Sequence, residues 1–362
     1  AALTYYGVLA LFPALIALLS IIGLLTDPAR LSEAITAVVP QQSARTLEPV
    51  IEQIAGNTGT AGFGLIVIAS TTRAPKFEGT GPRYVIIQIV AILLGIFMYA
   101  VISSIDVDTM SEHRLALVLF NVFLLLLLIP FGTDNGSGNR SWLHFPGFPV
   151  NIQPAEICKI TYIIIMASVM ASHQNNISGI PSVMHMVLHL GLLVGLNMAL
   201  SGDAGVSLIF VFIFIGMAFG GGVSLWWFAL AIAGIAAAIP IVFPLLGEYQ
   251  KERIYVLINP EFDKQGIGAR YHFKMNLQSL TGGGLTGQGL FNGNRTQAGS
   301  LFAEHTDYIF SSIGEELGFF GCVAVMILEL CIIARCVYVG VRCQDYMRRQ
   351  VCYGAAAALM FQ

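Results

Sequence analysis

The residues best suited to chemistry lie just before an apolar segment late in the chain. The segment Glu304-His305-Thr306-Asp307 directly precedes the apolar run Tyr308-Ile309-Phe310. A carboxylate at such a boundary is partly desolvated and could act as a general base, which makes Asp307 the first candidate. The alternative is a structural role, because Thr306 or Asp307 could accept backbone N–H bonds at the start of a helix.

A second group of chemical residues is the segment 153–159, which reads QPAEICK. Pro154 is typical of the first turn of a helix, and Glu156 suits the positive end of the helix dipole. Glu156 and Lys159 are three residues apart and therefore share a helix face. Lys159 then lies about one turn inside an apolar span, where an ammonium needs a partner or a water-filled cavity. Alternatively, Lys159 snorkels to the interface while it pairs with Glu156.

Three further motifs carry polar residues. Arg140 offers a forked donor suited to phosphate, and Trp142 beside it is either a membrane anchor or a substrate contact. Segment 201–205 (SGDAG) predicts a tight turn in which Asp203 is a turn residue. Segment 314–318 (GEELG) predicts the acidic start of a helix. The histidines show no metal-binding spacing, and His185 and His189 are interpreted as helix packing.

The composition identifies the class of protein that holds these residues. Of 362 residues, 56% are hydrophobic and 11% are charged, with a net charge of −3 and a mean hydropathy of +0.75. So few charges exclude a disordered chain and a nucleic-acid-binding surface, and they disfavour a soluble enzyme. The six cysteines form no C-x-x-C pair and are interpreted as packing thiols. The sequence predicts a polytopic membrane protein.

Apolar runs long enough to cross a bilayer predict an all-α transmembrane bundle with roughly eight full spans and two partial ones. The full spans are expected at 3–25, 84–105, 115–131, 157–172, 183–200, 204–220, 223–246 and 317–341. The partial ones are expected at 61–70 and 351–362, and residues 26–60 predict two short amphipathic helices.

The polar segment 247–311 lies between the spans at 223–246 and 317–341. Aromatic and aliphatic residues are interleaved with its charges, and a glycine-rich stretch covers 282–289. A loop of this length is usually functional or disordered, so it forms either a folded cap at the membrane surface or a flexible linker. The arginines at 342, 348 and 349 favour a cytoplasmic location for the end of the last full span, which would place the loop outside. Arg73, Lys76 and Arg83 lie in a loop on the opposite side and favour the reverse orientation.

The order and spacing of these motifs over about 71–362 resemble the SEDS family, the shape, elongation, division and sporulation proteins that include RodA, FtsW and SpoVE. The matching stretches are NRSWL at 139–143, QPAEICK at 153–159, SGDAG at 201–205, Arg253 with Pro260, Tyr271, Gln278-Ser279, GGGLTGQG at 282–289, HTDYIF at 305–310 and GEELG at 314–318.

This resemblance implies a peptidoglycan glycosyltransferase that polymerises lipid II at the outer face of the bacterial cytoplasmic membrane, beside a class B penicillin-binding protein transpeptidase. It implies that Asp307 is the catalytic loop aspartate and that Lys159 faces it across a cavity. Surrounding membrane lipid is expected, and nucleic acid is not. No resident metal or cofactor is expected, although Mg or Mn could bind together with the substrate pyrophosphate. The expected substrate-binding residues are Lys159, Glu156, Arg140, Trp142, Arg253, Gln153, His305 and Thr306.

The N-terminal 60 or so residues resemble a different family, YihY/BrkB. The similarity rests on AALTYY at 1–6, FPAL at 12–15 and QIAGN at 53–57. We therefore expect a composite chain joined near 57–70, with a YihY/BrkB-like part at 1–60 and a SEDS-like domain at 61–362. The second part is expected to lack the start of the family's first helix and its C-terminal helices.

Two other functions fit the same residues. A lipid II flippase or other transporter would line its pathway with intramembrane Lys159, Glu329 and Arg335. An inactive scaffold for a penicillin-binding protein is the third possibility.

Overall fold

A computed structural model describes residues 70–72, 86, 113–134, 139–145, 151–245, 251, 255, 271–300 and 307–362. The expected spans at 3–25 and 84–105, the amphipathic helices of 26–60 and nearly all of 61–70 lie outside these residues. So do Arg253, His305 and Thr306. The chain divides into two compact units, Ala1–Ile105 with Gly247–Val325, and Asp106–Leu246 with Met326–Gln362. We call the first the loop unit and the second the bundle unit.

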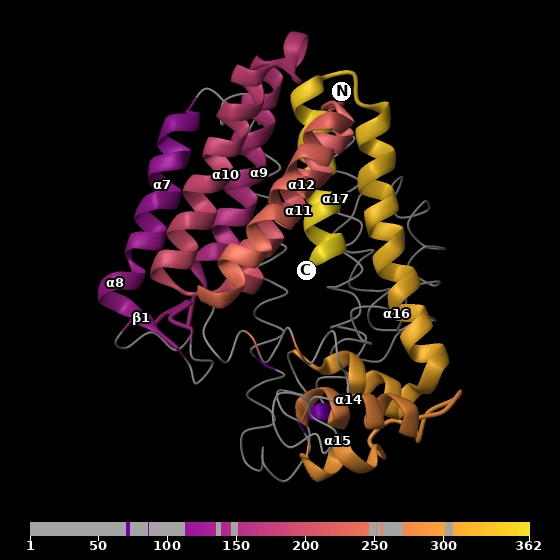
Figure 1. Cartoon of the computed structure of the whole chain (residues 1–362). Helices are drawn as coiled ribbons and strands as arrows, with labels where there is room; N and C mark the ends of the chain where they lie inside the picture. The colour runs from indigo at the N-terminus through magenta and orange to yellow at the C-terminus, as the bar shows by residue number, and fades with distance from the viewer. Residues whose placement is uncertain are drawn as a thin grey trace, which may run out of the picture. The chain divides into compact units, whose positions relative to one another are not determined.

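The described part of the bundle unit consists of helices and one short strand pair, with the loops that join them (Figure 1). Strands β1 and β2 are antiparallel, with Gly132 opposite Leu143 and Thr133 opposite Trp142. Two 3₁₀ turns, η2 (Gln174–Asn176) and η3 (Phe243–Leu245), follow α9 and α12. The elements are α7 (Arg114–Leu126), α8 (Leu128–Phe131), β1 (Gly132–Thr133), β2 (Trp142–Leu143), α9 (Pro154–Ser172), α10 (Ile180–Leu200), α11 (Ala204–Gly220), α12 (Leu225–Val242) and α17 (Tyr346–Phe361).

Helix α9 lies at the centre of this bundle. It contacts α7, α10, α11 and α17, and most of its residues are buried. Its Tyr162 packs edge-on against Phe210 of α11, with 5.5 Å between the ring centroids. Glycines let α17 approach α11 closely, because a Cβ on Gly216 would lie only 2.5 Å from the Ala357 Cβ. The core of the bundle therefore forms around α9 and is closed by α17.

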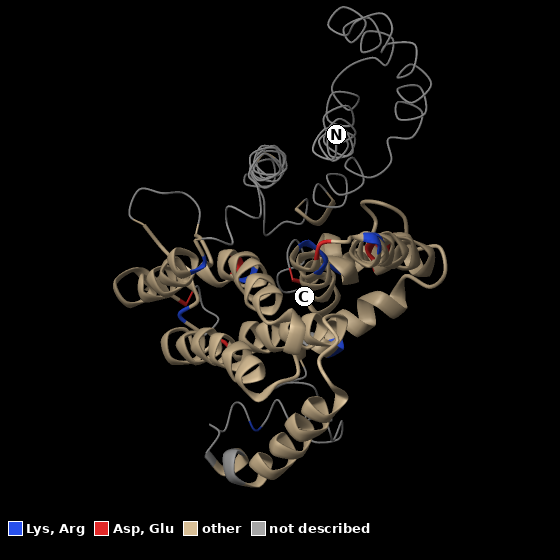
Figure 2. Cartoon of the chain, turned by 90° about the horizontal axis from the view of Figure 1, so that it is seen from above, with Lys and Arg blue, Asp and Glu red and all other residues tan. Residues whose placement is uncertain are grey.

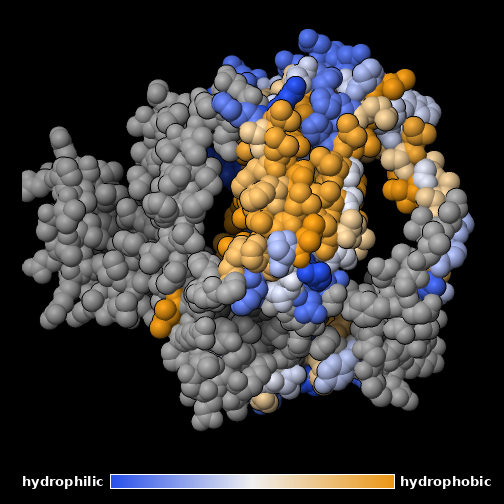
Figure 3. All heavy atoms as spheres, turned by 90° about the vertical axis from the view of Figure 1, so that its left-hand side faces the viewer, coloured by the Kyte–Doolittle hydropathy of each residue, from blue (hydrophilic) through white to orange (hydrophobic). Residues whose placement is uncertain are grey.

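The outer face of the bundle is apolar. Leu115 and Leu119 on α7 and Met184 and Leu188 on α10 are each more than half exposed. Figure 3 shows a hydrophobic band across this face between hydrophilic ends, and Figure 2 shows few charged residues on the helices. Such a surface is stable in contact with acyl chains rather than water.

Within the described residues, four helices are long and apolar enough to cross a membrane: Arg114–Phe131, Pro154–Ser172, Ile180–Leu200 and Ile309–Arg342. Helices α11 and α12 provide two shorter apolar segments. The described helices therefore confirm the predicted class, a polytopic helical membrane protein, and each span expected within the described residues coincides with a helix.

The loop unit contains α14 (Tyr271–Gly282), α15 (Asn294–Ala298) and the start of α16 (Ile309–Arg342). The described part of the 247–311 segment is thus folded, which favours the cap over the flexible linker. Helix α16 is interrupted at Gly318, where φ is 69° and ψ is −163°, so its long second segment begins close to the start expected at residue 317. A shorter first segment, from Ile309, was not predicted, and the two acids of the motif at 314–318 lie at the end of this first segment rather than at a helix start.

The glycine-rich stretch packs directly against this interruption. Gln288 N donates to the Glu315 carbonyl over 2.9 Å, and Phe319 N donates to the Gly284 carbonyl over 2.9 Å. A Cβ on Gly318 would lie 2.3 Å from the Gly287 nitrogen, so the two backbones meet only because both residues are glycine.

This close approach predicts a large difference between two glycine substitutions. Gly287→Ala should destabilise the loop unit by more than the roughly 1–2 kcal/mol that a positive φ costs an L residue, because its Cβ would lie 2.1 Å from the Glu316 carbonyl oxygen. Gly284→Ala is the matched control, since Gly284 also has a positive φ, +58°, but has nothing within 4 Å of an added Cβ. Equal shifts in the thermal unfolding of the two purified variants in detergent would contradict this explanation.

Candidate functional site

The segment 153–159 forms the start of α9 as predicted. Gln153 occupies the N-cap position with extended backbone, φ −94° and ψ 107°, and makes no side-chain cap hydrogen bond. Pro154 stands at the helix start, where the missing N–H costs nothing, and Glu156 lies in the first turn. This geometry brings Gln153, Glu156 and Lys159 to one end of the central helix.

Lys159 is a buried cation. Its side chain is 5% exposed, whereas that of its partner Glu156 is 43% exposed, and Lys159 Nζ lies 2.8 Å from Glu156 Oε2. This ion pair confirms that the two residues share a helix face. The burial means that Lys159 does not snorkel. Among the described residues, Nζ makes this ion pair and no other polar contact, and the surrounding protein encloses the atom.

The loop before α9 holds Arg140 and Trp142 at the same end of the bundle unit. Strand β2, which contains Trp142, pairs with β1, and Leu143 forms a bridge with Ile152 just before α9. Arg140 is exposed, and its Nη2 donates long hydrogen bonds to the carbonyls of Ile129 (3.3 Å) and Gly132 (3.4 Å). Part of the Arg140 guanidinium is therefore engaged by the chain, and the remainder faces outward.

The structure joins two motifs that sequence reasoning treated separately. Buried Ser141, between Arg140 and Trp142, donates from Oγ to Asp203 Oδ2 over 3.2 Å. Asp203 Oδ1 accepts from Val206 N over 3.1 Å, so this residue is the N-cap of α11 as well as the predicted turn residue. The link from 139–143 to 201–205 anchors the loop that presents Arg140.

Asp307 is exposed and lies two residues before α16. Within the described part of the chain its carboxylate accepts no hydrogen bond, so it does not act there as the helix cap that was considered as the alternative. Asp307 belongs to the loop unit and Lys159 to the bundle unit. Their opposition across a cavity stays a prediction, as do the roles of Arg253, His305 and Thr306.

Sequence reasoning missed the role of two buried acids in the loop unit. Glu315 and Glu316 are only 1% and 3% exposed. Glu315 accepts hydrogen bonds from the α15 backbone, and Glu316 accepts them from Ser70 and Gln297. The sequence shows that the two acids are adjacent between Gly314 and Gly318. It does not show their hydrogen-bond partners, because these residues are distant along the chain.

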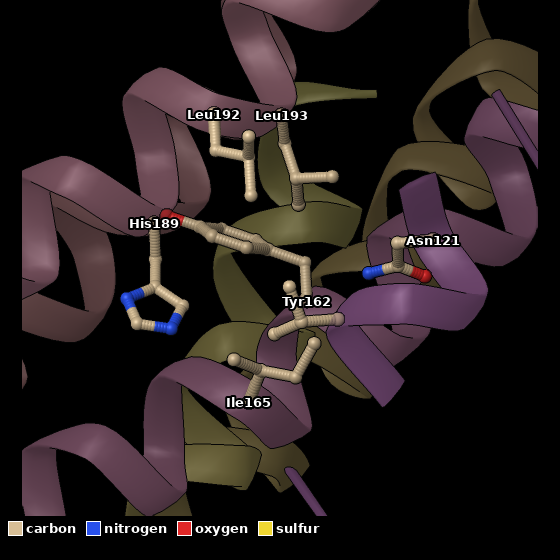
Figure 4. A pocket seen from close by; sticks show the side chains of 7 residues that line it. Asn121, Tyr162, Ile165, His189, Leu192 and Leu193 are labelled. Atoms are coloured by element: carbon tan, nitrogen blue, oxygen red, sulfur yellow. The ribbon is translucent and has the colours of Figure 1, made fainter. Parts of the chain in front are cut away.

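A small pocket in the bundle unit is lined by none of these candidate residues (Figure 4). The Tyr162 ring extends across it, and neither the Tyr162 hydroxyl nor Asn121 Nδ2 has a hydrogen-bond partner in the structure. The lining is mostly apolar and contributes no Lys or Arg, so it does not suit a pyrophosphate. Its residues are Val118, Asn121, Tyr162, Ile165, His189, Leu192 and Leu193.

The described residues contain no group of three or more His, Cys, Asp or Glu side chains placed to hold a metal ion. His185 packs against His189 with 4.8 Å between ring centroids and against His173 with 5.2 Å. These contacts agree with the interpretation of the i, i+4 pair as helix packing.

Two protein families match the chain. The FtsW/RodA/SpoVE family, described as "Cell cycle protein", matches residues 54–362. The family described as "Virulence factor BrkB" matches residues 1–74. The two matches overlap around the predicted join at 57–70, which supports a composite chain.

Curated relatives and solved structures agree with the first match. A probable peptidoglycan glycosyltransferase FtsW of Trichlorobacter lovleyi is 30% identical, over 81% of this chain and 76% of that protein. The peptidoglycan glycosyltransferase MrdB of Escherichia coli is 29% identical, over 73% of this chain and 70% of that protein.

Among solved structures, a chain from a peptidoglycan synthase complex has a TM-score of 0.64 at 24% identity, covering 83% of this chain and 84% of that chain. The rod shape determining protein RodA of Thermus thermophilus has a TM-score of 0.56 at 21% identity, covering 82% of this chain and 77% of that chain. These likenesses show a shared fold.

The contact between Ser141 and Asp203 predicts unequal effects of two cap substitutions. Asp203→Ala should destabilise the bundle unit by roughly 1–2 kcal/mol, because it removes both an N-cap and the bond from Ser141. Asp345→Ala removes only the N-cap of α17, where Asp345 Oδ1 accepts from Arg348 N over 2.8 Å, and should cost less. Thermal unfolding in detergent measures both, and a larger effect for Asp345→Ala would contradict the role of the Ser141 bond.

Proposed function

Because the chain belongs to the FtsW/RodA/SpoVE family of cell cycle proteins, we propose that it is a peptidoglycan glycosyltransferase that polymerises lipid II into glycan strands. The observation that carries this proposal is the buried Lys159 ammonium at the start of α9, which has Glu156 as its ion-pair partner and no second anion among the described residues. A buried cation among apolar helices is costly unless it binds an anion, and a lipid-linked pyrophosphate supplies that anion beside its own apolar tail.

The reaction needs a base and a stabilised leaving group. A bond forms between the acceptor hydroxyl oxygen and the anomeric carbon of the donor sugar, while the bond from that carbon to the pyrophosphate breaks. Asp307 is the proposed base that takes the hydroxyl proton. The departing pyrophosphate gains negative charge, which Lys159 and the outward part of Arg140 would neutralise.

The other predicted residues have supporting roles in this proposal. Glu156 orients Lys159 through the 2.8 Å ion pair. Gln153 and Trp142, at the same end of the bundle unit, would contact the sugars or the lipid interface. Arg253, His305 and Thr306 keep the substrate-binding roles that the family resemblance implies.

A divalent cation would enter this site with its substrate. Hard cations frequently share substrate phosphates instead of occupying a site made only of protein ligands. The protein would work in the cytoplasmic membrane of a bacterium with a class B penicillin-binding protein, which would cross-link the strands.

Asp307→Asn should abolish glycan polymerisation, because the amide cannot take up the acceptor proton. Folding should be unaffected, since the side chain is exposed and makes no hydrogen bond within the described residues. Purified protein, with and without a transpeptidase partner, would be assayed for glycan strands from lipid II. Asp345→Asn, which keeps its cap, is the control. Strand synthesis by Asp307→Asn would remove Asp307 as the base, and an inactive unsubstituted protein would contradict the enzymatic function itself.

Lys159→Met should lower the polymerisation activity without lowering the stability of the protein. Polymerisation should fall roughly 100-fold or more, as on removal of other charge-stabilising groups. The melting temperature should stay unchanged or rise, because the substitution removes a buried ammonium and leaves Glu156 partly solvated. Lys159→Arg keeps the charge and should retain part of the activity. A Lys159→Met protein that stays fully active would exclude a role for this ammonium in leaving-group stabilisation.

A further inference from the structure

The pair Glu315 and Glu316 comprises two buried carboxylates that the proposed reaction does not use. We propose that both are positioning residues, which lock the first segment of α16 and thereby hold Asp307 at the reaction centre. This inference rests on the proposed glycosyltransferase function and adds two residues to it. Neither carboxylate is proposed to touch the substrate.

Glu315 binds the start of α15 with both carboxylate oxygens. Its Oε1 accepts from Arg295 N over 2.8 Å. Its Oε2 accepts from Thr296 N over 3.0 Å and from Thr296 Oγ1 over 2.7 Å. Two of these three donors are backbone N–H groups, whose direction is set by the helix and which can only donate.

Glu316 binds a different part of the loop unit. Ser70 Oγ donates to its two oxygens over 2.7 and 2.6 Å, and Gln297 Nε2 donates to Oε1 over 2.9 Å. Gln297 Nε2 also lies 3.1 Å from the Ser70 carbonyl. The segment at 70–72 is fully buried here, so Glu316 ties it to the α15 region.

The backbone of the same two residues adds a third attachment. The carbonyls of Glu315 and Glu316 accept from Gln288 N and Gly289 N, each over 2.9 Å. Two consecutive residues thus fix α16 to α15, to the glycine-rich stretch and to Ser70. Because Gly318 interrupts the helix directly afterwards, this attachment, rather than the long second part of α16, sets the direction of the first part.

Asp307 depends on that direction. It lies two residues before α16, whose first residue, Ile309, is six residues or about 9 Å along the helix from Glu315, so a small rotation at Glu315 displaces the Asp307 carboxylate appreciably. A misplacement of about 1 Å, even when it arises far from the reacting atoms, can lower a catalytic rate by roughly 100-fold.

The hydrogen-bond donors around Glu315 and Glu316 differ, so we expect Glu315→Gln and Glu316→Gln to lower the activity by different amounts. Glu315→Gln places an NH₂ group against a backbone N–H that cannot accept, so the site is left with opposed donors. Glu316→Gln can be accommodated, because the Ser70 hydroxyl can turn and accept from the new NH₂ group while Gln297 still donates to the remaining oxygen. Glu315→Gln should therefore be the damaging substitution, although the two residues are adjacent and equally buried.

The test is steady-state glycan polymerisation by the full chain with its transpeptidase partner. Glu315→Gln should lower kcat by roughly tenfold or more and change KM for lipid II by less than about twofold, with the midpoint of the acid limb of the pH–rate profile unchanged. Glu316→Gln should leave kcat within about 1.5-fold of the unsubstituted value. Asp345→Asn, which keeps the N-cap of α17 in the bundle unit, should leave the rate unchanged.

Several results would overturn the inference. The first is an unchanged kcat for Glu315→Gln, and the second is a loss of kcat/KM that arises mainly from a higher KM. The third is a shifted midpoint of the acid limb of the pH–rate profile, which would make Glu315 a catalytic residue. An inactive unsubstituted chain contradicts the proposed function instead, so the two failures are distinguishable.

A structural measurement tests the hydrogen bonds between Glu315 and α15 without any activity assay. Hydrogen exchange at Arg295 N and Thr296 N should accelerate in Glu315→Gln and stay unchanged in Glu316→Gln, because only Glu315 accepts from these amides. If Glu315→Gln does not fold, Thr296→Val, which removes only the hydroxyl donor to Glu315, takes its place and should lower kcat by roughly threefold. Unchanged exchange in Glu315→Gln, or unchanged kcat in Thr296→Val, would refute the positioning role.

Discussion

Every polar group that this chain buries among its helices must find its partner inside the protein, and this constraint shapes both units. In the loop unit, the carboxylates of Glu315 and Glu316 bind α15 and Ser70, and their backbone carbonyls bind the glycine-rich stretch. In the bundle unit, Asp203 joins Ser141 to the first turn of α11. Lys159, the Tyr162 hydroxyl and Asn121 Nδ2 are exceptions among the described residues, and Lys159, which is paired with Glu156, is the one of these three that could attract an anionic substrate.

The helices were largely predictable because hydropathy and local signals act over short distances. The bounds of α11 were predicted to the residue, since an N-cap aspartate precedes an uninterrupted apolar run that ends at glycines. The start of α9 followed from Pro154 and Glu156 in the same way. The interruption of α16 was not predicted, because the pattern of the sequence continues through Gly318 and only the nearby glycine-rich stretch explains it.

The arrangement of the site could be predicted only in part. The pairing of Glu156 with Lys159 is a matter of helix periodicity, so spacing was sufficient. The contacts of Ser141 with Asp203 and of Ser70 with Glu316 join residues about 60 and 250 positions apart, and no local rule connects them. The identities of these residues suggested caps and turns, which describe one hydrogen bond of each side chain and omit the long-range ones.

The position of α17 has a consequence for the order in which the protein is assembled during synthesis. This helix covers faces of α9 and α11 that are translated more than 125 residues before it (Figure 1). Until α17 enters the membrane, glycine-lined surfaces on α11 and the buried side of α9 have only lipid or an insertion factor as neighbours. The bundle therefore cannot fold one helix at a time during translation. The packing around α9 reaches its native form only in a cooperative step after α17 has been made.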